Sequence, residues 1–334
     1  MNTKESAALS APPKYVQTLE RNFTAMASDI HLRVDDPNVD CQTALSAAET
    51  VFRHIEESCT RFDPDSSLMQ ANRRANHWCR VSPECFQAIA LAHSAHVETH
   101  GRFDPRVLQT LQAQGYTESL DFESEGVVVS PGPKSQNLTD PAAAFVTPWA
   151  PGLDPVESSV RIGPVPIDLG GIGKGLAVRL AAQSLEFAGR TALVEAGGDC
   201  AAIGSGPDGD GWRIGIEDPT GALEPVAVVN VVDTAVATSS IRLRHWRVGN
   251  MPVHHLIDPS TGKPGGQGLL AVTVIFPDAA WAEVWSKSLF LVGAANIAEA
   301  SAERGLAALW VDQDGVVGRS SPMEQFLIWE RTDG

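Results

Sequence analysis

The stretch Pro166-Ile167-Asp168-Leu169-Gly170-Gly171-Ile172-Gly173-Lys174-Gly175-Leu176-Ala177 lies in the middle of the chain and decides its predicted organisation. A run rich in β-branched residues precedes it, and a helical pattern of apolar residues follows it. We therefore predict a strand, a glycine turn and the start of a helix. Glycines permit close backbone approach and positive φ. Free N–H groups at the helix N-terminus, together with the Lys174 ammonium, favour a phosphate or pyrophosphate ligand.

Two known nucleotide-binding motifs do not match this turn, and a purely structural role remains open. It is not a Walker A loop, because Gly175 follows Lys174 where that loop has Ser or Thr. It is not a good Rossmann fingerprint, because no acidic residue ends a second strand at the required distance. Taken alone, the turn is as consistent with a tight structural turn and a solvated lysine as it is with an anion-binding site.

Charge and composition limit the possible partners. The 334 residues include 25 basic and 41 acidic ones, and the net charge of −16 disfavours nucleic acid and anionic membranes. No segment approaches the ~20 apolar residues of a membrane span. Five cysteines without metal-like spacing indicate free thiols in a reducing compartment. Because the N-terminal residues carry no signal-peptide pattern, we expect a cytoplasmic protein.

Apolar periodicity outlines the secondary structure. We expect residues 23–34 to begin as a loop and end as a strand, and residues 101–149 to be irregular apart from a short strand at 127–129. Because strands outnumber helices and come in runs, the pattern favours an α+β fold. It predicts one domain over residues 17–334 after a disordered tail at 1–16. Helices are predicted at 43–59, 83–100, 176–185 and 281–292, and strands at 191–196, 212–216, 226–232, 235–238 and 270–276.

Seven short segments along the chain place turn residues beside charged or polar ones: Ala25-Met26, 61–67, 102–104, the central turn, 195–199, 237–240 and 254–262. In order and content they resemble the motifs of the ApbE family of FAD:protein FMN transferases, over residues 22 to 295. The resemblance implies a single domain of mixed, largely antiparallel sheets with flanking helices. It also implies a protein that cleaves FAD with Mg²⁺, joins FMN through a phosphoester to a Thr or Ser hydroxyl of an acceptor protein, and releases AMP.

The resemblance also assigns residues. His255 matches a histidine before an Ile-Asp-Pro turn and is the candidate base, and Lys174 is the candidate for neutralising the phosphates. Gly171 matches a position whose carbonyl binds the metal. Considered one at a time, without the other motifs, Met26, Phe62 and His255 would each be interpreted as ordinary structural residues. The positions that the resemblance implies to contact FAD are Met26, Phe62, Arg102, Phe103, Asp104, Asp168, Lys174 and His255.

One segment departs from the family pattern. Where family members carry an Asp and a Thr as magnesium ligands, this chain has Glu283 and Lys287, four residues apart on one helical face. A glutamate can still bind Mg²⁺, but an ammonium has no acceptor atom. Lys287 therefore either pairs with Glu283 or places its ammonium where the cation would be, and we expect metal affinity to be reduced or lost while FAD binding is kept. In a smaller departure, Ala27 replaces the usual glycine after Met26.

This departure leaves a second function open. An FAD-binding protein that stores, senses or slowly hydrolyses the nucleotide would need the adenine and ribose contacts without the metal. A flavin-using oxidoreductase is a weaker alternative, because the sequence has no nicotinamide-binding fingerprint.

Overall fold

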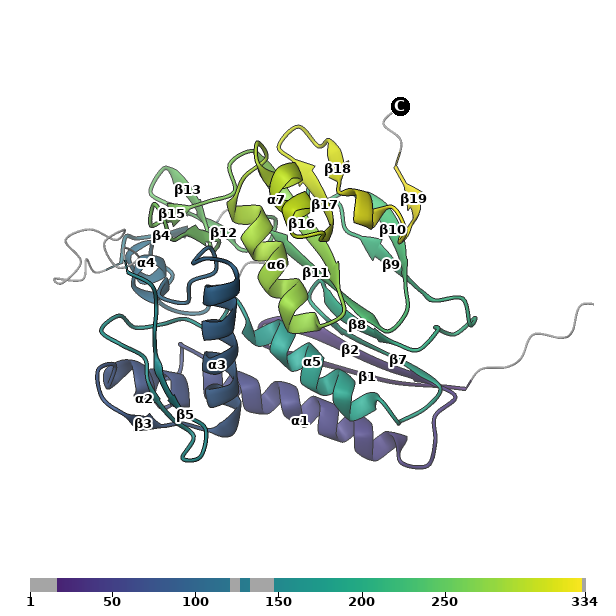
Figure 1. Ribbon diagram of the computed structural model, residues 1–334, viewed down its shortest axis with the longest axis horizontal. Helices are drawn as coiled ribbons and strands as arrows, with labels where there is room; N and C mark the ends of the chain where they lie inside the picture. Colours follow the sequence, from purple (N-terminus) through teal and green to yellow (C-terminus); the bar gives the residue numbers. More distant parts are fainter. Residues whose placement is uncertain (1–16, 121–126, 133–146, 332–334) are drawn as a thin grey trace, which may run out of the picture.

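The computed structural model describes residues 17–120, 127–132 and 147–331, so the predicted tail at 1–16 lies outside the described residues. Its largest element is an eight-stranded sheet in the order β1-β2-β7-β8-β11-β16-β17-β18 (Figure 1). Every neighbouring pair in this sheet is antiparallel. The α+β class and the largely antiparallel pairing are therefore confirmed. The strands are β1 (Thr18–Ala25), β2 (Ser28–Asp35), β7 (Thr191–Ala196), β8 (Asp199–Ile203), β11 (Thr234–Ser240), β16 (Leu269–Phe276), β17 (Ala307–Asp312) and β18 (Val317–Arg319).

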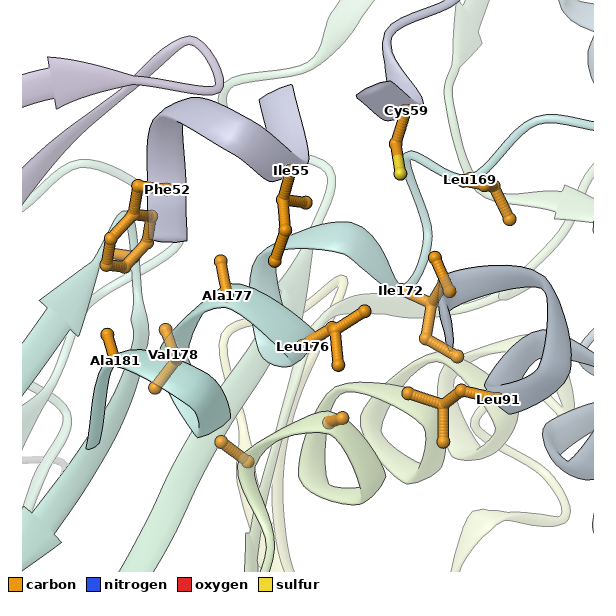
Figure 2. Close-up of a cluster of buried hydrophobic side chains, with 14 of the residues drawn as sticks. Phe52, Ile55, Cys59, Leu91, Leu169, Ile172, Leu176, Ala177, Val178 and Ala181 are labelled. Atoms are coloured by element: carbon orange, nitrogen blue, oxygen red, sulfur yellow. The ribbon is translucent and has the colours of Figure 1, made fainter. Parts of the chain in front are cut away.

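Three helices lie in a row across one face of this sheet: α1 (Cys41–Cys59), α5 (Gly173–Leu185) and α6 (Ala279–Leu291) (Figure 1). Apolar residues recur at helical spacing along α1 and are fully buried. Figure 2 shows Phe52 and Ile55 of α1 facing Leu176 and Ala177 of α5. Further helices are α2 (Ser67–Arg73), α3 (Pro83–Glu98), which packs on α1, α4 (Leu108–Ala113) and α7 (Ile297–Glu303).

A three-stranded sheet covers the other face, in the order β19-β10-β9. Its strands are β9 (Trp212–Ile216), β10 (Ala227–Val231) and β19 (Leu327–Glu330). Trp212 and Val229 from this sheet pack with Val236 and Leu309 of the main sheet in one buried apolar cluster. Side chains alternate across β11, so Val236 enters this cluster while its neighbours Ala235 and Ala237 face the helices.

Short strands complete the fold around the end of α1 and the start of α5. One sheet has the order β3-β6-β5 and another β13-β12-β4, and β14 pairs with β15. The predicted short strand at 127–129 is confirmed as β4. The bounds are β3 (Cys79–Arg80), β4 (Val128–Val129), β5 (Gly152–Asp154), β6 (Ser159–Arg161), β12 (His245–Val248), β13 (Met251–His254), β14 (Ile257–Asp258), β15 (Lys263–Pro264) and a 3₁₀ turn at Ser321–Met323.

The expected loop at residue 23 is wrong. β1 runs on to Ala25 and pairs with β2 from Ser28, so Met26 and Ala27 form a two-residue hairpin turn with φ of 56° and 52°. Such turns need positive φ at both central residues and are usually marked by Asn-Gly. Met-Ala carries no such signal, which is why the sequence pattern missed the hairpin.

The strand expected to lead directly into the glycine turn is also absent from the described structure. β6 ends at Arg161, six residues before Ile167. The Ile167 backbone is instead bonded by a buried side chain: its N–H donates to Asn72 Oδ1 at 2.8 Å, and Asn72 Nδ2 donates to its carbonyl at 2.9 Å. A side-chain amide thus replaces the neighbouring strand that a ladder would require. α4 likewise lies in a region expected to be irregular.

All five cysteines are free thiols, as predicted, and the structure buries all of them. None of the described helices is long and apolar enough to cross a membrane. The extent of a single domain over residues 17–334 stays a prediction.

Candidate active site

A cavity of about 420 Å³ opens where the end of α1, the 102–107 loop, the start of α5 and the segment after β13 meet. This volume is in the range of small-molecule sites. Glu283 is fully buried beside the cavity and contacts it through Lys287. The other predicted site residues all line the cavity: Met26, Phe62, Arg102, Phe103, Asp104, Asp168, Gly171, Lys174, His255 and Lys287.

The glycines of the central turn serve close packing. Gly170, Gly171, Gly173 and Gly175 all have ordinary φ, so the expected use of positive φ is not found in them. A Cβ on Gly175 would lie 2.8 Å from the Ala279 carbonyl oxygen and from Ala280 Cα, both on α6. Gly175 is therefore required because α5 begins directly against α6.

The N–H groups of this turn are largely used within the protein. Gly170 N donates to Asp168 Oδ1 at 2.8 Å, and Gly175 N donates to Glu283 Oε2 at 2.8 Å. Glu283 therefore places its own carboxylate at the positive end of α5. The expectation that free N–H groups of the turn would hold a phosphate needs correction, because side-chain cations are the stronger candidates.

Two lysines that line the cavity pair with two buried carboxylates. Lys174 pairs with Asp199, and Lys287 Nζ lies 3.0 Å from Glu283 Oε1. Burial raises the pKa of Asp199 although Lys174 opposes the shift. Burial also pushes the pKa of Glu283 upward, but Lys287 and Lys174 together hold it below its ordinary value. Both carboxylates are nearly inaccessible, whereas both lysine side chains reach the cavity.

His255 lies on the cavity wall with a defined hydrogen-bonding pattern. Its Nδ1 lies 3.2 Å from the carbonyl oxygen of Arg244. A carbonyl only accepts, so Nδ1 carries the hydrogen and Nε2 is left as an acceptor. Burial lowers the pKa of His255 well below its ordinary value, and the positive charges of Arg244 and Lys287 lower it further. The imidazole is therefore neutral.

The sequence analysis missed Arg61 as a site residue. Its Nε lies 3.0 Å from Asp168 Oδ2, and its guanidinium lies over the rings of Phe62 at 4.3 Å and Tyr116 at 4.1 Å. Arg61 Nη2 is buried and has no hydrogen-bond partner among the described residues, although the side chain is only 5% exposed. Its position after α1 carried no periodic signal, so only the fold shows this donor.

Asp104 is held by its neighbours within a tight loop. Arg106 donates to it from Nε at 2.9 Å and from Nη2 at 2.6 Å, and His96 Nδ1 lies 3.4 Å away. Phe103 is buried next to it, and Arg102 is exposed at the rim. Asp104 therefore shapes the wall that carries these two side chains, and its contact with FAD stays a prediction.

Met26 reaches the cavity from the strained hairpin turn. Its N–H donates to Glu56 Oε1 at 2.6 Å, which ties the turn to α1. Its Cε would lie 3.1 Å from a Cβ on Gly173, so the thioether covers the first turn of α5. Two elements far apart in sequence thus meet at one edge of the cavity.

The site belongs to a largely antiparallel α+β fold in which two lysines and a neutral histidine line one cavity, and comparison with known proteins identifies the family. The family model "ApbE family" matches residues 26–310. The chain therefore belongs to the ApbE family. The FAD:protein FMN transferase of Klebsiella pneumoniae is 28% identical over 285 residues, which are 80% of this chain and 77% of that protein. That of Chlamydia trachomatis is 28% identical over 254 residues, 74% and 75% of the two chains. The crystal structure of the ApbE protein of Thermotoga maritima covers 95% of this chain and 100% of its own, with a TM-score of 0.80 and 28% identity.

The residues at the metal position that the resemblance implies do not fit a magnesium ion. Mg²⁺ requires oxygen ligands in near-octahedral geometry. Here the two oxygens of Glu283 already accept from Lys287 Nζ and Gly175 N, and the Thr position is a lysine. Among the described residues, no three His, Cys, Asp or Glu side chains group as a metal site.

Proposed function

We propose that this chain is an FAD:protein FMN transferase, which cleaves FAD, attaches FMN through a phosphoester to a Thr or Ser hydroxyl of an acceptor protein, and releases AMP. The observation that carries the proposal is that one cavity brings together Lys174, Lys287 and His255. Membership of the ApbE family and the names of its relatives support it.

The lysines would hold the pyrophosphate. Phosphoryl transfer depends mainly on positioning and on neutralising charge at the phosphate oxygens. Lys174 and Lys287 both extend from buried carboxylates into the cavity, so their ammonium groups are held in place before a ligand arrives. This preorganisation lowers the cost of ordering two flexible side chains on binding.

His255 would take the proton of the attacking hydroxyl. The acceptor oxygen forms a bond to the phosphorus on the FMN side, and the bond from that phosphorus to the bridging oxygen breaks. AMP leaves with the bridging oxygen, and the hydroxyl proton moves to His255 Nε2. The bond to the Arg244 carbonyl, which leaves Nε2 as the acceptor, supports this role.

The aromatic end of the cavity would hold a flat ring of FAD. Phe62 is 40% exposed and lines the cavity. Its ring centroid lies 5.7 Å from that of Tyr116. Arg61 Nη2 would donate to an oxygen or ring nitrogen of the nucleotide, because a buried donor without a partner is costly.

The experiment is incubation of the pure protein with FAD and a threonine-bearing acceptor peptide, with AMP followed by chromatography and the peptide by mass. We expect AMP and an FMN-sized adduct from the unaltered protein, and a loss of about 10²-fold or more in rate for His255→Asn. His77→Asn is the matched control, because His77 is exposed and lies outside the cavity. Equal rates for both variants would contradict the role of His255.

The alternative is an FAD-binding protein without transfer activity. It is favoured by the pairing of both cavity lysines with buried carboxylates, which leaves the cluster with little net positive charge for a pyrophosphate. FAD recovered intact from the protein, with no AMP under any condition, would support this alternative over the transferase.

We also place the protein in the cytoplasm. Its five cysteines are all free, which fits a reducing compartment. Cell fractionation tests this placement, and recovery outside the cytoplasmic membrane would contradict it.

A further inference from the structure

We propose that the ammonium group of Lys287 is the resident cation of the phosphate site, so that this chain binds FAD without a divalent metal. This inference rests on the proposed FAD site and deepens it, since it states which charge faces the pyrophosphate. The relevant observation is that Lys287 pairs with the carboxylate of Glu283 and fills the space between this carboxylate and Gly171.

The geometry places Lys287 between Glu283 and the glycine turn. Its Nζ lies 3.0 Å from Glu283 Oε1, and its Cε would lie 3.3 Å from a Cβ on Gly171. The lysine stem therefore passes directly along the Gly171 backbone and ends at the carboxylate. These are the same three positions at which the resemblance implies metal ligands, and here they contact one another through the lysine.

Both oxygens of the carboxylate already accept a hydrogen bond. Glu283 is 1% exposed, and its second oxygen accepts from Gly175 N at 2.8 Å. A magnesium ion would need to displace Lys287 and leave an ammonium unpaired beside a dication. That arrangement is unfavourable because the two positive charges would lie within a few ångströms of each other.

Lys287 can serve both the carboxylate and a ligand. An ammonium has three donor hydrogens, and one of them is used by Glu283. The lysine side chain is 15% exposed and lines the cavity, while the carboxylate behind it is inaccessible. The remaining donors are therefore available to phosphate oxygens, and the buried charge of Glu283 keeps the lysine in position.

The pairing predicts what a change at Lys287 would do. With threonine at this position, Glu283 would be a buried carboxylate without its cation, next to a hydroxyl oxygen and the Gly171 carbonyl. Such a group of oxygens suits Mg²⁺. Lys287→Thr should therefore convert a metal-independent site into a metal-dependent one.

The experiment measures FAD binding by flavin fluorescence, and Mg²⁺ binding by calorimetry with FAD present, on protein first treated with EDTA. For the unaltered chain, we expect FAD affinity with EDTA and with Mg²⁺ to agree within about twofold, and no heat from Mg²⁺. For Lys287→Thr, we expect FAD affinity to fall about tenfold or more in EDTA and to recover with Mg²⁺. Mg²⁺ should then bind at one site per chain.

Two further variants guard the result. Lys263→Thr is the matched control, because Lys263 is exposed and does not line the cavity, and it should behave as the unaltered chain. Lys287→Arg keeps the positive charge and should keep FAD binding insensitive to EDTA. If Lys287→Thr fails to fold, Lys287→Arg and the unaltered chain still decide the question.

Several outcomes would overturn the proposal. They are a tenfold loss of FAD affinity when the unaltered chain is treated with EDTA, one-site Mg²⁺ binding to that chain, or metal-free FAD binding by Lys287→Thr as tight as before. Failure of the proposed function would look different: AMP would not be released under any condition, although FAD binding stayed insensitive to EDTA. If FAD did not bind at all, a gain of Mg²⁺ binding by Lys287→Thr alone would still support the lysine as the resident cation.

Discussion

The two faces of the eight-stranded sheet are covered in different ways. The helical side ends in the cavity and buries charged side chains, among them Asp168, Asp199 and Glu283. The side covered by β9, β10 and β19 has a core of apolar residues such as Trp212, Val229 and Leu309. Buried charges are expensive unless they are paired. The fold accepts this cost beside the cavity, where each of these three carboxylates has a cationic partner.

The largest expected effect comes from breaking a buried pair on the helical side. Lys287→Met would leave the Glu283 carboxylate buried without its cation, and we expect it to lower the free energy of unfolding by about 3–5 kcal/mol. Arg319→Met, which breaks a partly exposed ion pair between β18 and β19, should cost at most about 1 kcal/mol. Urea denaturation of both variants measures the difference. Similar losses would mean that Glu283 finds another partner.

Substitution of one glycine on each face of the sheet tests the same comparison. Gly175→Ala would place a methyl group 2.8 Å from two backbone atoms of α6 and disturb the bond to Glu283, so we expect a loss of about 1–3 kcal/mol. Gly215→Ala in β9 would meet Pro225 at an ordinary 3.6 Å and should be neutral or slightly stabilising. Thermal unfolding of both variants tests this. A neutral Gly175→Ala would show that α5 and α6 can separate without cost.

The helical side should also be sensitive to acid. Burial lowers the pKa of His254, which packs edge-on against Phe290, from 6.5 to about 4. The unfolded chain therefore binds more protons than the folded one between these values, and the free energy of unfolding falls as the pH falls from 6.5 to 4. We expect this group to contribute a loss of up to about 2 kcal/mol, allowing for partial exposure.

Urea titrations at several pH values measure this loss. His254→Gln should flatten the dependence between pH 6.5 and 4, whereas the exposed His77→Gln should not. An unchanged slope for His254→Gln would assign the acid sensitivity to other groups.

The smallest expected effect concerns two turns with positive φ. Ala27 has a φ of 52°, so Ala27→Gly should relieve strain and stabilise the protein by about 1 kcal/mol. Asp233, at the turn between β10 and β11, has a φ of 47°, but its Oδ1 accepts from Gly204 N at 2.6 Å. Asp233→Gly would lose this bond and should not stabilise. Differential scanning calorimetry compares the two variants, and equal shifts would contradict the reasoning.

Elements with a local pattern in their own residues were predicted from the sequence, and elements without one were missed. α1 was predicted within two residues because its apolar positions repeat at helical spacing, and β7 was predicted with its bounds. The hairpin at Met26 was missed because its turn lacks the usual residues. The segment before the glycine turn was misjudged because a side chain, Asn72, takes the part of a neighbouring strand, and no local pattern announces that.

The candidate site likewise contains residues that the sequence predicted and residues that only the structure shows. Most of the predicted site residues that line the cavity come from the motifs, since each motif is local in sequence. Arg61 was missed because the burial of its side chain and the lack of a hydrogen-bond partner for Nη2 arise only when the chain folds. The glycines were expected to bring the backbone close to a ligand, but the neighbour that Gly175 approaches is α6, which lies more than a hundred residues away.

The sequence by itself determined the α+β class, the membership suggested by the motifs, and the replacement of two metal-binding residue types by Glu283 and Lys287. These are properties of residue identity, spacing and order. Only the tertiary structure shows that Lys287 pairs with Glu283 and also lines the cavity. The physical reason is that pairing and burial depend on which helices meet, and α5 meets α6 through contacts that no local pattern encodes.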